Sequence, residues 1–320
     1  MRRYLLRRLL HMGPVLVITL GLNFALIHLA PGDPIVLLAG DSGDEAYYAA
    51  MRRRWGLDRP LGEQWFRYLL QVLRGELGYS FQYQQPVLSV IASRLWPTLL
   101  LTGTSLVVAT GVGLWLGVQA SVRAGTPIEH AIGTLTLLGG TLPTFWVGQV
   151  LVIVFAAGLG LFPIQGMVSP RAAHTGLRYA LDVAHHLVLP ALTLTVWQLA
   201  LIVHVTRAGM REALAGEFIR TAHAKGVAPR AIWYRHALRH AVLPLLTVVG
   251  QHMGTFLAGA TLTEIVFAWP GLGRLLYDAT LARDYPLLLA MVLVTAVMVM
   301  IATLATDLLY ALSDPRIRYA

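Results

Sequence analysis

Six long apolar segments dominate this sequence, and polar or basic stretches separate them. The segments cover residues 12–30, 98–122, 131–157, 187–206, 241–263 and 285–306. A helix needs about 20 apolar residues to cross the hydrocarbon core of a bilayer, and each segment reaches that length. Formal charges are almost absent from the segment interiors. The sequence therefore predicts an all-α polytopic membrane protein with six transmembrane helices.

The composition agrees with a membrane protein and excludes several other classes. The chain is 56% hydrophobic and 13% charged, with a mean hydropathy of +0.63, which is too apolar for an ordinary soluble domain. Its net charge of +9 could indicate nucleic-acid binding, but the basic residues mostly flank the apolar segments, where they act as topology determinants. Cysteine is absent, which excludes disulfides and thiolate metal ligands.

The N-terminal residues 1–10, MRRYLLRRLL, resemble the basic region of a signal peptide. The apolar run behind them is too long for such a peptide and lacks a cleavage site, so we expect an uncleaved first span. The four arginines place the N-terminus in the cytoplasm. With six spans, the C-terminus, the loop near Arg123 and the loop over 207–240 are then also cytoplasmic. We expect a multi-pass membrane protein with both termini in the cytoplasm.

Residues 31–97 fall on the outer side in this scheme, although they carry seven arginines. Loops longer than about 60 residues escape the charge rule, so the orientation is kept. A capping-box pattern at 42–45 predicts a helix that ends at Gly56, and a second helix over 61–74 has one apolar face. That face carries Trp65, Leu69, Val72 and Leu73. We expect a small periplasmic helical lobe whose apolar face packs rather than binds a ligand.

The expected organisation has three parts: a tail and first helix over 1–30, the lobe over 31–97, and a five-helix core over 98–320. Within the core, Gly111, Gly113 and Gly117 have spacings that permit close helix contact. The stretch from Gly139 to Pro143 predicts a kink or break in the third span. Such a break lies against protein or a water-filled cavity, so both a packing role and a pathway-lining role remain open.

Several chemistries lack the residues that they need. The single lysine, Lys225, is followed by Gly226 rather than Ser or Thr, so the chain has no Walker A loop for ATP. His185 and His186 lack a third ligand at suitable spacing, and we predict no metal site. The sequence shows neither a Ser/His/Asp pattern for nucleophilic catalysis nor an H-E-x-x-H motif. The ionisable residues in or near the spans are His28, His204, His252, Glu264 and Asp307. We expect each of these to be a hydrogen-bonded or snorkelling residue, not a site for coupling ions.

A basic loop over 207–241 lies between two apolar segments. Its sequence favours a helix over 212–225, a C′ glycine at Gly226, and a second helix that begins with Pro229. The small residues at the bend allow this helix–turn–helix to enter a cleft on a partner. A helix pair resting on acidic lipid headgroups fits the residues equally well.

The chain resembles the inner-membrane permease subunits of binding-protein-dependent ABC importers, in the branch for peptides and nickel. The resemblance covers nearly the whole length and rests on ordered motifs: LAPGDP at 29–34, GLDRP at 56–60, RGELGYS at 74–80, LPTFWVG at 142–148, RTAHAKGVAPRAIWYRHALRHAVLP at 220–244, EIVFAWPGLGRLL at 264–276, RDYP at 283–286 and DLLYALSDPRIR at 307–318. In the basic loop, positions 220–222 read Arg-Thr-Ala where the family's EAA motif has Glu-Ala-Ala. Histidines stand at 204, 223 and 240 where the branch commonly has Arg, Arg and Asn.

The resemblance implies a permease fold and a transport function without catalysis by this chain. The subunit would form half of a translocation pathway for di- or oligopeptides, beside a second homologous permease. Two ATPase subunits would bind ATP and Mg²⁺, and a periplasmic or lipid-anchored binding protein would deliver the substrate. This chain would bind no cofactor and no nucleic acid. Nickel or another small solute remains an alternative cargo, and a self-sufficient secondary transporter is the alternative from another class.

The resemblance also implies site residues. The ATPase-coupling loop would present Glu217, Phe218, Arg220, Thr221, Ala222, His223, Lys225, Gly226 and Pro229. The pathway would be lined by residues near the expected break in the third span, and the candidates are Pro143, Phe145 and Trp146. Transmission through the loop requires the fourth span to run unbroken from Leu187 into Glu212.

Overall fold

The structure, a computed structural model, describes residues 2–29, 35, 43–55, 57–170 and 175–313. Within these ranges the side chains of 2–9, 11, 54–55, 243, 246–248, 251–259 and 309–313 lie outside the description. Helices form nearly all of the regular structure. The chain divides into two compact units, one of Met1–Trp96 with Gly271–Ile301, the other of Pro97–Pro270 with Ala302–Ala320.

Four described helices are long and apolar enough to cross a membrane. They are α1 (Arg2–Leu29), α5 (Val87–Val122), α8 (Leu177–Leu214) and α13 (Tyr285–Ser313). They coincide with four of the six predicted spans, and α5 and α8 each begin about ten residues before the apolar segment that they contain. The predicted span over 241–263 falls in α11 (Leu238–Val266), many of whose side chains lie outside the description. The count of six is therefore not confirmed.

The remaining predicted span, over 131–157, is broken at Pro143. It consists of α6 (Pro127–Thr141) and α7 (Thr144–Leu151), and α7 continues as the π-helical segment η1 (Val152–Gly158). The two halves meet at an angle of 104°. Leu142 has an extended backbone (ψ 139°), the conformation that a following proline imposes, so the helix ends there. The predicted break is confirmed, and the two halves form one span only as a bent pair.

The first unit contains the predicted helical lobe. Within the predicted range 31–97, the lobe consists of α3 (Glu45–Trp55), α4 (Leu61–Leu73) and a two-stranded antiparallel hairpin of β1 (Tyr79–Ser80) and β2 (Gln85–Pro86). The first unit also contains α12 (Leu272–Leu281). Its core joins Val87 and Ile91, at the start of α5, with Leu275 of α12 and Leu287 of α13. Sequence analysis did not predict the hairpin.

Both lobe helices were predicted, with details that the structure corrects. The α3 cap is Asp44, whose Oδ1 accepts the Tyr47 amide at 2.7 Å, and Ser42 of the predicted capping box lies outside the described residues. In α4, Trp65 packs edge-on against Phe24 of α1, with ring centroids 5.5 Å apart. Leu73 is 73% exposed, so the apolar face is narrower than the sequence suggested.

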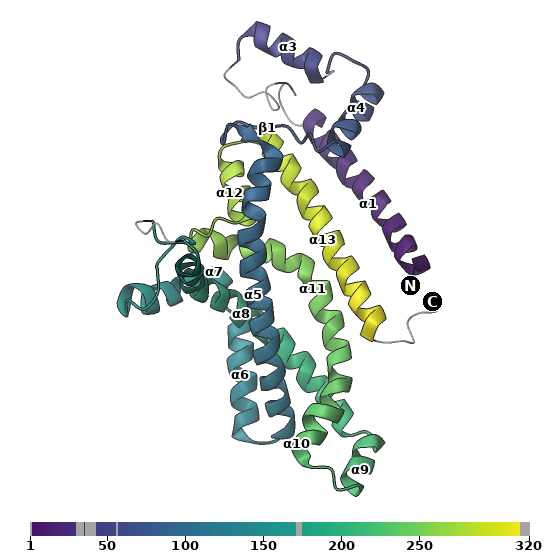
Figure 1. The fold of residues 1–320 in the computed structure, drawn as a ribbon, viewed down its shortest axis with the longest axis vertical. Coiled ribbons are helices and arrows are strands. Elements are labelled where there is room, and N and C mark those ends of the chain that lie inside the picture. Colours follow the sequence, from purple (N-terminus) through teal and green to yellow (C-terminus); the bar gives the residue numbers. More distant parts are fainter. Residues whose placement is uncertain (1, 30–34, 36–42, 56, 171–174, 314–320) are drawn as a thin grey trace. The chain divides into compact units, whose positions relative to one another are not determined.

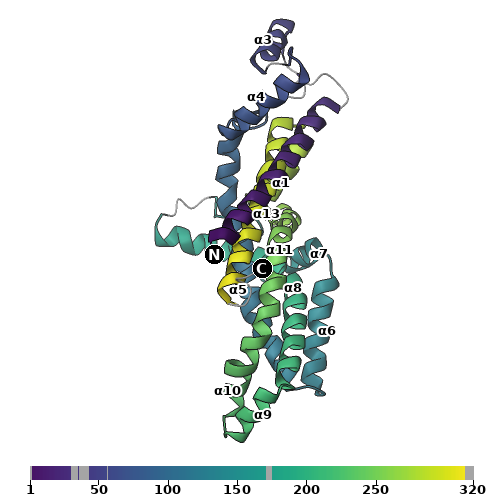
Figure 2. The same cartoon turned by 90° about the vertical axis from the view of Figure 1, so that its right-hand side faces the viewer.

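The second unit is organised around α8, which packs against α6, α7 and α11 (Figures 1 and 2). Small residues permit the closest approaches. A Cβ atom on Gly117 of α5 would lie 2.5 Å from Cβ of Thr206, and a Cβ on Gly140 of α6 would lie 2.4 Å from Cβ of Ala200. Gly113 likewise faces Ile202, whereas Gly111 has open space around it. Gly113 and Gly117 therefore form the predicted close contact, and Gly111 does not.

Candidate functional site

The basic loop begins where α8 ends. As predicted, α8 runs without interruption through Leu187 and Glu212, and it ends at Leu214. The predicted helix over 212–225 is wrong in one respect, because the chain breaks at Gly216 and a separate helix, α9, covers Glu217–Ala224. Gly216 has an extended backbone (ψ 149°), and a Cβ there would lie 2.7 Å from the Phe218 ring. Glycine lowers helix propensity and alone leaves room for this approach.

The bend after α9 has the predicted geometry. Gly226 has a positive φ of 75°, and its N–H donates to the His223 carbonyl at 3.0 Å. The N–H of Val227 donates to the Ala222 carbonyl at 3.2 Å. A glycine at C′ closes a helix in this way because it has no Cβ to clash in the left-handed region.

The chain then returns towards the membrane-spanning helices. Pro229 opens the short helix α10 (Pro229–Ala231), as predicted from its suitability for a first helical position. A π-helical segment, η2 (Ile232–Ala237), follows and leads into α11. Sequence analysis did not foresee the π segment. Figures 1 and 2 show α9 and α10 at the end of the second unit where α8 and α11 meet the loop.

An apolar core fixes the inner side of the loop. Ile219 and Ala222 of α9 are 3% and 7% exposed. They belong to a cluster whose other buried members are Val118, Met210, Ala213, Ile232, Ala237 and Ala241. These residues come from α5, α8, the π segment and α11. The loop is thus packed into the second unit, so a displacement of α9 acts on three long helices.

The outer side of the loop is exposed. Eight of the nine residues proposed for ATPase coupling lie there, and Ala222 is the exception because it belongs to the apolar core. Arg220 donates to Glu217 at 2.9 Å in a pair whose side chains are 77% and 86% exposed. The Phe218 side chain is 40% exposed and its ring lies 4.6 Å from that of His240. A polar, positively charged surface with one aromatic side chain therefore faces outward.

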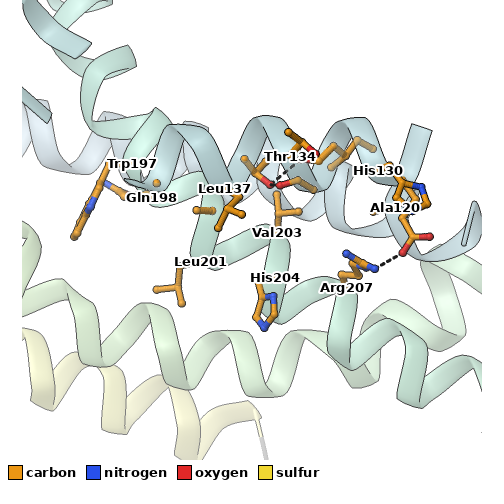
Figure 3. Close-up of a pocket in the computed structure, with 16 residues that line it drawn as sticks. Ala120, His130, Thr134, Leu137, Trp197, Gln198, Leu201, Val203, His204 and Arg207 are labelled. Atoms are coloured by element: carbon orange, nitrogen blue, oxygen red, sulfur yellow. Dashed lines mark hydrogen bonds and ion pairs between the residues drawn. The ribbon is translucent and has the colours of Figure 1, made fainter. Parts of the chain in front are cut away.

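A cavity of about 670 Å³ lies between α6 and α8 (Figure 3). The labelled side chains extend from Trp197 and Gln198 at one end to Arg207 and Ala120 at the other. His204 also lines it. The predicted pathway residues Pro143, Phe145 and Trp146 do not line this cavity. They are exposed at the start of α7, on the far side of the helix break.

The polar end of the cavity contains an ion-pair cluster that sequence analysis missed. Glu129, in the first turn of α6, pairs with both Arg207 and Arg211 of α8, and its Oε1 accepts from Nη2 of Arg211 at 2.6 Å. Its other oxygen accepts the Gly125 amide at 2.6 Å. A sequence signal existed, because Glu129 is the only carboxylate between Glu76 and Asp182.

Among the other ionisable residues singled out in the sequence, His28 and Glu264 each have a hydrogen-bond partner. His28 Nε2 lies 2.9 Å from Gln64 Oε1, and Glu264 accepts the Thr98 hydroxyl at 2.7 Å. His186 Nδ1 lies 3.3 Å from an Asp182 oxygen. The side chain of His252 lies outside the described residues, and Asp307 is partly buried in α13. The described residues contain no cluster of three potential metal ligands.

Two family models cover almost the whole chain. The model of the binding-protein-dependent transport system inner membrane component matches residues 109–319, and the model of the N-terminal part of such components matches residues 1–102. The chain belongs to this family. The predicted recognition is thereby confirmed, and this membrane component is a permease subunit with several membrane-spanning helices.

Curated relatives match the membrane component over its full length. It is 38% identical to the dipeptide transport system permease protein DppB of Escherichia coli (strain K12), over 100% of this chain and 99% of that protein. It is also 38% identical to the glutathione transport system permease protein GsiC of Salmonella typhi, over 100% of both. The di/tripeptide permease DppB of Pseudomonas aeruginosa (strain UCBPP-PA14) is 37% identical, over 93% of both chains.

Solved structures support the fold. An inward-facing form of the MetNI methionine ABC transporter matches with a TM-score of 0.57 and 17% identity, over 72% of this chain and 98% of that chain. At this identity the likeness shows the fold alone. The predicted fold of an ABC importer permease is confirmed.

Proposed function

We propose that the membrane component forms half of the translocation pathway of an ATP-driven importer for short peptides. The observation that carries this proposal is the loop after α8, which combines an exposed basic surface with an underside packed on α5, α8 and α11. The relatives named for dipeptide, di/tripeptide and glutathione transport support peptides as the cargo.

The proposed partners follow from this role. A second homologous permease would complete the pathway, two ATPase subunits would bind ATP and Mg²⁺, and a periplasmic or lipid-anchored binding protein would deliver the peptide. The membrane component itself would bind no cofactor and catalyse no reaction. Its N- and C-termini and the loop around α9 would face the cytoplasm, where the ATPases are.

In the proposed mechanism the loop works as a lever. ATP-driven closure of the ATPases would draw the loops of the two permeases together and open the pathway outward, and hydrolysis would reset it. The force would pass from the exposed face of α9 through Ile219 and Ala222 into the apolar core beneath. The uninterrupted course of α8 from Ala191, after Pro190, to Leu214 supports this path, because a continuous helix transmits a displacement along its length.

Replacement of Gly226 by proline tests the lever. Proline fixes φ near −65°, so it cannot adopt the φ of 75° that closes α9. In vesicles containing the whole complex, we expect G226P to insert and assemble but to lose peptide uptake driven by ATP. Wild-type uptake together with normal stimulation of ATP hydrolysis by the binding protein would contradict the role of the loop.

A further inference from the structure

A single carboxylate fastens α6 to α8 close to the basic loop. The side chain of Glu129 is 6% exposed, and its Oε1 is shared by Arg207 and Arg211. These arginines are four residues apart, so they project from the same face of α8 one helical turn apart. Arg211 belongs to the last turn of α8, next to the break at Gly216. The carboxylate therefore holds α8 at the point where the loop begins.

The same carboxylate also orders the turn that precedes α6. Its Oε2 accepts the amide of Gly125, whose φ of 79° requires glycine. At this level Ser121, near the end of α5, donates from its hydroxyl to the Arg207 carbonyl at 3.1 Å. The end of α5, the turn and the start of α6 are thus all bound to one short stretch of α8.

A second contact fastens the opposite end of α6 to α8. This contact is formed by small residues rather than by an ion pair. A Cβ on Gly139 would lie 2.8 Å from Cγ1 of Val196, and a Cβ on Gly140 would lie 2.4 Å from Cβ of Ala200. The cavity of Figure 3 lies between the two contacts, with Glu129 and Arg207 lining one end. The α6 wall of the cavity is therefore attached to α8 at both ends.

The two contacts differ in how they resist movement. The small-residue contact at Gly140 holds by close packing alone, without directional bonds between side chains. The Glu129 cluster joins charge-assisted hydrogen bonds from two side chains and a backbone amide, which fixes direction as well as distance. Sliding of α8 past α6 would leave a buried carboxylate without its cations, which is strongly unfavourable.

We propose that Glu129 is the positioning residue that makes α6 move with α8 during transport. This inference rests on the proposed function of the loop. When the loop displaces the end of α8, the ion-pair cluster carries the start of α6 with it. The movement reaches the cavity wall and, at the other end of α6, the break at Pro143.

The first test compares Glu129→Gln with Glu63→Gln in the whole complex reconstituted in vesicles. Glu63 is a matched control because it also pairs with two arginines, Arg59 and Arg67, but on the exposed surface of α4. For E129Q we expect assembly and ATP hydrolysis close to wild type, with dipeptide uptake per ATP reduced by about 5-fold or more, as loss of a typical coupling energy predicts. E63Q should match the wild type.

Two results would overturn the proposal. One is an unchanged uptake per ATP in E129Q, and the other is an equal loss of uptake and hydrolysis, which indicates a merely structural role. If E129Q fails to assemble, Arg211→Gln serves instead, because this arginine is half exposed and leaves the pair with Arg207 intact. R211Q should show a smaller loss of coupling than about 5-fold in the same assay, and full coupling in R211Q would count against the proposal.

The second test measures the movement directly. The chain contains no cysteine, so Ala124 and Glu212, both exposed, can be replaced by cysteines and spin-labelled without other changes. The distance between the labels should stay the same in the nucleotide-free and ATP-trapped complexes, and should differ between these states once E129Q is added. A distance that is equally constant with E129Q would refute the proposed role of Glu129. Absence of peptide uptake by the wild type would instead refute the proposed function and leave this distance test standing.

Discussion

The indole N–H of Trp269 donates a hydrogen bond of 2.9 Å to the carbonyl of Pro97, across 172 positions of sequence. Trp269 is completely buried and packs with Leu101 and Leu194. It is the third residue after the end of α11, whereas Pro97 interrupts the regular hydrogen bonding of α5. The bond thus connects the segment that follows α11 to Pro97 of α5.

Replacement of Trp269 by phenylalanine should destabilise the second unit. The change removes the hydrogen bond and leaves a small void, which together cost about 1–3 kcal/mol. Trp115→Phe is the control, since Trp115 is 56% exposed on α5. Thermal unfolding in detergent, followed by size-exclusion chromatography, should show a lower midpoint for W269F alone. Equal shifts for the two variants would contradict the structural role of the bond.

The helix contact between α5 and α8 gives a second prediction. Alanine at Gly117 would place its Cβ 2.5 Å from that of Thr206, and relief of such overpacking costs about 1–3 kcal/mol. Alanine at Gly111 meets nothing within 4 Å and should be neutral or slightly stabilising. The same thermal measurement distinguishes them. A loss of stability in G111A that matches G117A would mean that the contact is not specific.

Because Lys225 is the single lysine, a lysine-specific protease can probe the loop selectively. Lys225 is exposed beside the bend, so a lysine-specific protease should cut the chain once, into residues 1–225 and 226–320. We expect cleavage only from the cytoplasmic face of membrane vesicles, and protection when the ATPase subunits are bound. Lys225→Arg should abolish the cut. Cleavage from the outer face would reverse the proposed orientation, and cleavage unaffected by the ATPases would argue against docking at this bend.

Substitutions at two adjacent residues of α9 should have different effects: one should lower stability, and the other should weaken ATPase binding. Ile219 is 3% exposed, and its replacement by alanine should cost about 2–5 kcal/mol of stability. Phe218 is 40% exposed, so F218A should change stability by less than about 0.5 kcal/mol. We expect F218A to weaken ATPase binding by about 10-fold, as for a central aromatic contact. Sedimentation of the complex and thermal unfolding measure the two effects, and full ATPase affinity in F218A would exclude it from the interface.

Local patterns in the sequence predicted the local structure well. Apolar length located α1, α5, α8 and α13, and the steric demands of Pro143 predicted the break between α6 and α7. The bend at Gly226 followed from the preference of glycine for positive φ. Each of these features depends on neighbouring residues only.

Features that depend on distant residues were missed. The partners of Glu129 lie 78 and 82 positions away, and no periodicity brings such residues together in advance. The break at Gly216 was overlooked because one glycine only weakens a helix, and the close approach of the Phe218 ring to this position is known only from the folded backbone. The pathway residues Pro143, Phe145 and Trp146 remain a prediction, because they do not line the cavity between α6 and α8.

The apolar underside of the loop has a consequence for the evolution of such subunits. Residues on the outer face of α9 contribute nothing to the core, so they can be exchanged one at a time while the fold is retained. His223 lies at one such exposed outer position. The outer face of this eight-residue helix can therefore change its side chains, while its inner face is constrained by the apolar core.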